Sequence, residues 1–77
     1  MNDEPFKNFI KNRQITINTI TEMAKNGTTK EGLYLVLEIE LNKLIADIFD
    51  LEENEIDFGL YSLEETISNC RKAIKGD

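Results

Sequence analysis

The chain has 77 residues, which is enough for one small domain with a modest hydrophobic core. It contains no histidine and one cysteine, so histidine-dependent catalysis, histidine or thiolate metal sites and an internal disulfide are excluded. Its formal net charge of −6 disfavours direct binding to nucleic acid, whose phosphates would be repelled. The sequence therefore predicts a protein that is not an enzyme, with no cofactor and no metal site.

Two features bear on localisation, the first residues and the single cysteine. Residues 1–5 are acidic and polar, unlike the basic and then apolar start of a secretory signal, and no apolar run reaches the ~18 residues of a membrane span. A small domain without disulfides suits a reducing compartment. We therefore expect a cytoplasmic protein with no membrane partner.

Apolar residues at helical spacing predict a first helix over residues 4–25. Its middle is rich in β-branched residues, which have low helix propensity, so a break near residues 12–14 is the alternative. Arg13 interrupts the apolar stripe of this helix. We expect Arg13 to pair with Glu40 or Asp47 across the bundle, or to lie at a dimer seam.

A second helix is predicted over residues 29–51. Gly27 can take the left-handed conformation that ends the first helix, and Thr28 and Glu31 have the spacing of a capping box. The main apolar stripe of this helix consists of Leu33, Leu37, Leu41, Leu44 and Ile48. A second apolar patch, almost opposite, consists of Leu35, Ile39 and Ala46. Apolar residues on two sides are typical of a central helix.

The last helix is predicted over residues 63–75, after a structured loop over residues 51–61. Ser62 and Glu65 make a second capping box, and basic residues near the end of the helix suit the negative pole of its dipole. Its buried stripe is expected to consist of Leu63, Ile67, Cys70 and Ile74. Short connections force neighbouring helices to pack antiparallel. We therefore predict an all-α fold in which residues 1–77 form one small antiparallel bundle of three or four helices.

The acidic residues gather in the middle of the chain. Residues 38–65 carry ten acidic side chains and one basic side chain, that of Lys43. The acids of the loop are spaced almost like calcium ligands, but Glu55 stands where a calcium loop needs glycine and Tyr61 where it needs a bidentate acid. We therefore expect no calcium site. A carboxylate enzyme that uses a divalent metal is the remaining catalytic alternative.

This acidic segment would attract a basic protein surface and speed the encounter with it. The predicted partner-binding residues are Asp47, Asp50, Glu52, Glu53, Glu55, Asp57, Phe58 and Tyr61. The acids would steer the partner and accept charge-assisted hydrogen bonds, whereas Phe58 and Tyr61 would supply buried contact area. The alternatives are that the acids form an ordinary solvated surface and that the two aromatic residues belong to the core.

The stretch from Leu41 to Ile74, LNKLIADIFDLEENEIDFGLYSLEETISNCRKAI, resembles in layout the last two helices of the small immunity proteins that neutralise colicin D-type tRNase toxins. Those proteins end with a long helix carrying a Leu-Asp-aromatic pattern, an acidic loop and a helix that begins with acids. The matching positions here are Leu44, Asp47, Phe49, the acids from Glu52 to Asp57, and Glu64 and Glu65. The resemblance implies an acidic helical inhibitor that occupies a basic RNA-binding cleft.

The leading hypothesis is therefore a non-enzymatic, cytoplasmic protein of a bacterium or phage that inhibits a basic protein partner such as a nuclease toxin. The alternative belongs to a different class. It is a small structural or regulatory module that self-associates as a homodimer through the second apolar patch of the middle helix, formed by Leu35, Ile39 and Ala46.

Overall fold

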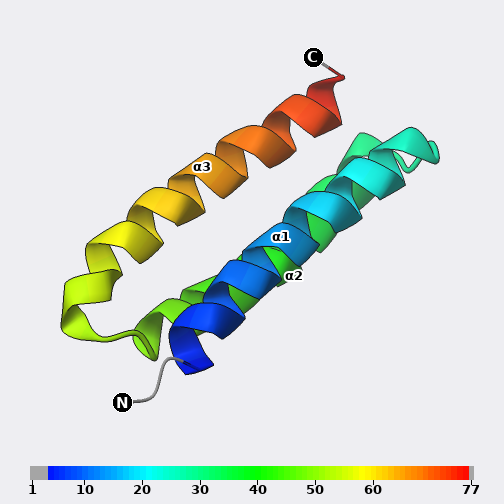
Figure 1. Ribbon diagram of the computed structural model, residues 1–77. Coiled ribbons are helices and arrows are strands. Elements are labelled where there is room, and N and C mark those ends of the chain that lie inside the picture. Colours follow the sequence, from blue (N-terminus) through cyan, green and yellow to red (C-terminus); the bar gives the residue numbers. More distant parts are fainter. Residues whose placement is uncertain (1–3, 77) are drawn as a thin grey trace.

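The computed structural model describes residues 4–76, which form three α-helices and one short 3₁₀ helix. The elements are α1 (Glu4–Lys25), α2 (Lys30–Phe49), η1 (Glu53–Glu55) and α3 (Ile56–Lys75). Each α-helix packs against the other two, and no strand occurs among the described residues, so the predicted all-α class is confirmed. The turn between α1 and α2 lies at the same end of the 43 Å long molecule as the end of α3, whereas α1 begins beside the α2–α3 connection (Figure 1).

Helix α1 has the bounds that its periodicity predicts, and it is continuous through residues 12–14. Its β-branched run does not break it, because packing against two neighbours outweighs weak local propensity. The helix ends in a Schellman motif around Gly27, whose φ of 86° is left-handed. The Gly27 N–H donates to the Ala24 carbonyl at 3.2 Å, and the Thr28 N–H donates to the Met23 carbonyl at 3.0 Å.

Helix α2 is capped by Thr29, not by the predicted pair of Thr28 and Glu31. The Thr29 hydroxyl accepts a hydrogen bond from the Gly32 N–H at 3.2 Å. The cap lies one residue later than predicted because the N–H of Thr28 closes the end of α1, whereas Thr29 has the extended backbone that an N-cap needs. The helix ends at Phe49, two residues before its predicted end.

Helix α3 begins at Ile56, seven residues before its predicted start at residue 63. Much of the loop predicted over residues 51–61 is therefore helical. The capping box predicted for Ser62 and Glu65 is wrong, because both residues lie inside the helix and Ser62 is buried.

The start of α3 is prepared by a reciprocal pair of hydrogen bonds around η1. The Glu52 N–H donates to the Glu55 carboxylate at 3.0 Å, and the Glu55 N–H donates to the Glu52 carbonyl at 2.8 Å. These bonds satisfy backbone groups at the start of the turn that leads into α3. The carboxylate of Glu55 and the backbone of Glu52, both in the predicted partner-binding segment, thus help to form local structure.

The core has two apolar clusters along the bundle axis. One consists of Ile20, Leu33, Leu37, Cys70 and Ile74, and the other of Phe9, Leu44, Ile48 and Leu51. The half-buried Leu41 packs against both clusters. Near the middle, the buried hydroxyls of Thr16 and Thr66 donate to the carbonyls of Asn12 and Ser62 at 2.9 and 2.7 Å, so each has a partner within its own helix.

The buried face of α3 is made mostly of small residues. It consists of Gly59, Ser62, Thr66, Cys70 and Ile74, whereas the predicted Leu63 and Ile67 are only half-buried. Small side chains allow the helix backbone to approach its neighbour closely. A Cβ atom on Gly59 would lie 2.9 Å from Leu51 Cδ1 and 3.3 Å from Ile48 Cγ1. Glycine therefore sets the close contact between the start of α3 and the end of α2.

Candidate protein-binding surfaces

The charged residues divide along the long axis of the bundle. The half that contains the α1–α2 turn, residues 15–39 and 66–76, carries five basic and three acidic side chains. The other half, residues 4–14 and 40–65, carries ten acidic and four basic side chains. We call these halves the basic end and the acidic end. The uneven charge along the sequence thus becomes a separation of charge along the molecule.

At the tip of the acidic end, the predicted acids form an acidic cap of four exposed residues, Asp50, Glu52, Glu53 and Asp57. Among residues 4–76, no ion pair involves any of the four. Asp57 lies in the first turn of α3, where the helix dipole favours a negative charge. The predicted Glu55 differs from them, because it is half-buried and its carboxylate accepts the Glu52 N–H.

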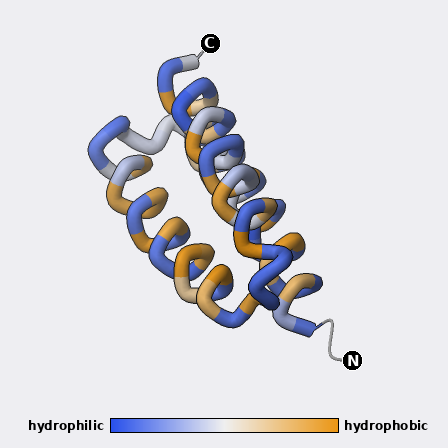
Figure 2. The backbone as a smooth tube through the Cα atoms, turned by 90° about the vertical axis from the view of Figure 1, so that its left-hand side faces the viewer, coloured by the Kyte–Doolittle hydropathy of each residue, from blue (hydrophilic) through white to orange (hydrophobic). Residues whose placement is uncertain are grey.

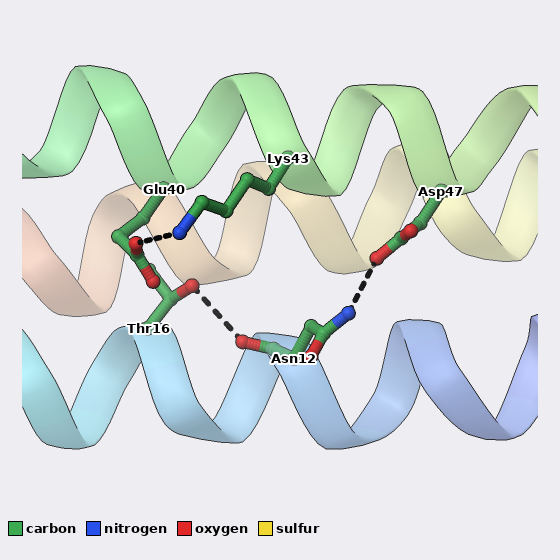
Figure 3. A network of polar contacts seen from close by, with 5 residues as sticks. All are labelled: Asn12, Thr16, Glu40, Lys43 and Asp47. Atoms are coloured by element: carbon green, nitrogen blue, oxygen red, sulfur yellow. Dashed lines mark hydrogen bonds and ion pairs between the residues drawn. The ribbon is translucent and has the colours of Figure 1, made fainter.

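Asp47 lies apart from the cap, on the side of α2 that faces α1. Its carboxylate accepts a hydrogen bond from Asn12 Nδ2 at 2.8 Å, and the Asn12 carbonyl in turn accepts the Thr16 hydroxyl (Figure 3). One turn away, Lys43 Nζ lies 3.1 Å from the carboxylate of Glu40. Asp47 therefore joins two helices, and its predicted contact with an external partner stays a prediction.

The two predicted aromatic anchors lie on the exposed surface of α3. Phe58 is 45% exposed, and its ring packs against that of Phe6 with centroids 5.5 Å apart. Tyr61 is 61% exposed, and its hydroxyl donates to the Glu65 carboxylate at 3.4 Å. The alternative that these residues belong to the core is wrong, since both keep about half of their surface in contact with solvent.

Arg13 pairs with α3 rather than with α2. Its guanidinium Nη2 lies 3.9 Å from Glu65 Oε1, and its buried Nε has no hydrogen-bond partner among the described residues. The predicted partners Glu40 and Asp47 are engaged by Lys43 and by an amide of α1 instead. Sequence spacing could not identify this pair, because it depends on which face α3 turns toward α1.

A second exposed surface runs along α2, on the side away from the core. We call it the outer face of α2, and it consists of Leu35, Ile39, Asn42, Ala46 and Phe49, flanked by Tyr34 and Ile45. Phe49 is 83% exposed, more than any other large apolar residue described. The expectation that neighbours cover α2 on two sides is wrong, because α1 and α3 both pack on the side that carries Leu37 and Leu44. Figure 2 shows apolar residues recurring along the length of each helix.

Sequence reasoning missed Phe49 and Leu60 as exposed apolar residues. The signal for Phe49 was present, since residues 35, 39, 42, 46 and 49 follow alternating steps of four and three along one face. Leu60 carried no comparable signal, because its position depends on the early start of α3.

The described part of the chain shows no feature of a small-molecule or metal site. A shallow hollow is lined only by side chains along one face of α3, so no second element closes it. Across residues 4–76, no three acidic or thiol groups converge closely enough to hold a metal ion. None of the helices has a stretch both long and apolar enough to span a lipid bilayer.

Comparisons of the chain with protein-family models, curated proteins and solved structures found no match. We therefore infer the function from the two surfaces, the acidic cap and the outer face of α2.

Proposed function

We propose that this protein is a non-enzymatic inhibitor of the immunity type, which binds a basic protein such as a nuclease toxin through its acidic end. The acidic cap is the observation that carries the proposal. Four exposed carboxylates gather at one tip, and no basic side chain of the described residues pairs with them. In this proposal the three helices form an antiparallel bundle whose function is to present that tip.

Charge and shape together support this function. Enzymes that act on nucleic acids have basic clefts, and an acidic surface competes with their substrate while accelerating the encounter. The bundle measures 43 × 17 × 15 Å, so the acidic cap lies at the end of an elongated molecule. Phe58 and Tyr61, on the adjoining surface of α3, would add the aromatic contact area on which affinity usually depends.

The test compares two variants with the same change of charge. The cap variant combines Glu52→Gln, Glu53→Gln and Asp57→Asn, and the control combines Glu22→Gln, Glu31→Gln and Glu38→Gln, which are exposed residues of the basic end. Wild-type protein immobilised at low salt is used to capture the basic partner, and stopped-flow mixing then measures the association rate with each variant.

We expect the cap variant to associate about tenfold more slowly at low salt and to show a flatter dependence on ionic strength. The control should keep most of the wild-type rate. Equal rates and equal salt dependence for the two variants would show that the cap does not guide binding.

A second candidate function, a module that self-associates as a homodimer, is favoured by the outer face of α2. Single exposed apolar residues are common, but a row of them along one helix marks a contact surface. Sedimentation equilibrium over a range of protein concentrations tests this candidate, and a monomer at every concentration would exclude it.

A further inference from the structure

The outer side of α2 carries more large apolar residues than the outer side of an ordinary surface helix. Glu40 and Asp47 lie toward α1 and are partly buried, whereas Leu35, Ile39 and Phe49 point away from the rest of the molecule. A surface helix of a monomer usually turns its charged residues to water and its apolar residues inward. The outer face of α2 therefore has the character of an interface that a single copy leaves open.

The size of this face approaches the lower limit for one half of a specific interface. Leu35 is 63% exposed and Ile39 is 56% exposed, and Tyr34, Ile45 and Phe49 add to the same surface. At about 200 Å² for each large side chain, the five expose roughly 550 Å². A specific interface buries at least about 600 Å² on each partner. The exposed parts of Asn42 and Ala46 lie on the same face and would raise its area to about this value.

We propose that a second copy of this chain covers the outer face of α2, with the two α2 helices antiparallel. The proposal deepens the second candidate function by stating its surface and orientation. The alternating steps of four and three residues along the face are those of paired helices that pack side chains into one seam. A two-fold axis would place the same face of each copy on both sides of the interface.

Charge selects the antiparallel orientation over the parallel one. In an antiparallel pair, the acidic end of each copy lies along the basic end of the other, so Asp50 and Glu53 approach the partner's end that carries Lys25 and Lys30. In a parallel pair, the acidic ends of the two copies would lie side by side and repel each other. Opposite helix dipoles also favour the antiparallel pair.

Side-chain size points to the same orientation. In one antiparallel register, residues 32–49 of one copy lie alongside residues 32–49 of the other copy in reverse order, and the two-fold axis passes between residues 40 and 41. That register places Phe49 opposite Gly32 and Leu35 opposite Ala46, so large side chains meet small ones. A parallel pair in register would place each of these residues against itself, large on large and small on small.

The first experiment measures association of the full chain by sedimentation equilibrium. The test variant is Ile39→Glu on the outer face of α2, and the matched control is Ile15→Glu, which changes an exposed isoleucine of α1. Because both positions are exposed in the monomer, circular dichroism should show folded helices in both variants. Asn42→Arg is a second outer-face variant that removes no apolar contact of the monomer.

We expect a dimer for the wild type and for Ile15→Glu, and association at least about tenfold weaker for Ile39→Glu and Asn42→Arg, since each places a charge in the seam. A wild-type monomer would overturn the proposal together with the second candidate function. Equal weakening by the α1 control would overturn the assignment of this face.

The second experiment tests orientation with a short bis-maleimide. Asn42→Cys lies near the proposed axis, so its two thiols are within reach of each other. Asp50→Cys lies far from the axis, and its two copies would be about 28 Å apart along an antiparallel pair at 1.5 Å per residue. The wild type, whose one cysteine is buried, is the blank.

Cross-linking of Asn42→Cys but not of Asp50→Cys is the expected result. Cross-linking of both variants would show a parallel pair. That outcome would overturn the proposed orientation while leaving the second candidate function intact.

Discussion

Replacing Gly59 by alanine tests whether the close packing at the start of α3 requires glycine at this position. Alanine in place of glycine inside a helix stabilises it by about 1 kcal/mol through propensity alone. The new Cβ would lie 2.9 Å from Leu51 Cδ1 and 3.3 Å from Ile48 Cγ1, well inside ordinary carbon–carbon contact. Overpacking of this kind costs about 1–3 kcal/mol, so we expect Gly59→Ala to destabilise the protein by about 1 kcal/mol net.

Urea unfolding followed by circular dichroism measures this change, and a loss of 1 kcal/mol corresponds to a fall in Tm of about 4–8 °C for a domain of this size. The matched control is Ser68→Ala on the exposed surface of α3, which should be neutral or slightly stabilising because it gains propensity without a clash.

A double-mutant cycle identifies the clash directly. In a Leu51→Ala background the obstructing Cδ1 atom is gone, so Gly59→Ala should there cost nothing or stabilise the protein. The coupling free energy between the two substitutions should be about 1–2 kcal/mol. If Gly59→Ala stabilises the wild type by the full propensity gain, or if the coupling is zero, the close approach is not what requires glycine.

The remaining predictions concern the start of α2 and the buried thiol. Thr29→Ala should lower the free energy of unfolding, measured with urea, by about 1 kcal/mol, because the Thr29 hydroxyl accepts the Gly32 N–H as the N-cap. Thr28→Ala should have a smaller effect, and equal effects of the two substitutions would contradict this prediction. Burial raises the pKa of the Cys70 thiol above its ordinary 9.0, so the unfolded chain ionises first as pH rises. The free energy of unfolding should therefore be insensitive to this group at pH 7 and fall above about pH 9, and the difference between the wild type and Cys70→Ala should narrow at pH 10.

The elements that the sequence predicted well are those whose apolar period is long and unbroken. The period of α1 gives both of its bounds, and the main stripe of α2 identifies Leu33, Leu37, Leu44 and Ile48, all of which are buried. In both helices many apolar residues lie on the same face, so a few residues of low helix propensity do not prevent the helix from forming.

The start of α3 could not be predicted in the same way. Residues 56–60 alternate like a strand and include Gly59, and both features disfavour a helix locally. The contact of Gly59 with Leu51 and Ile48 exists only in the folded chain. The same limit explains the ion pair of Arg13, since the rotation of α3 follows from small buried residues that carry no hydrophobic signal.

The acidic residues in the sequence predict an acidic surface near residues 47–57, but they do not show which carboxylates form hydrogen bonds within the fold and which face solvent. Only hydrogen-bond partners separate Asp47 and Glu55, which hold the fold together, from Glu52 and Glu53, whose carboxylates face solvent. The partner-binding role of the cap stays a prediction. The outer face of α2 was visible in the sequence as a second apolar patch, but whether α1 or α3 covers it was a question of three-dimensional packing.

The separation of charge along the bundle has a consequence for how the molecule behaves in salt. Its 43 Å length is about five times the screening distance of ~8 Å at physiological ionic strength. Each end therefore interacts with its surroundings as a separate charged body, the basic end with a net charge of +2 (five basic, three acidic) and the acidic end with −6 (four basic, ten acidic). An anion exchanger would bind the acidic end, and a cation exchanger would bind the basic end. Near a charged surface, the molecule would be oriented with the end of opposite charge toward that surface.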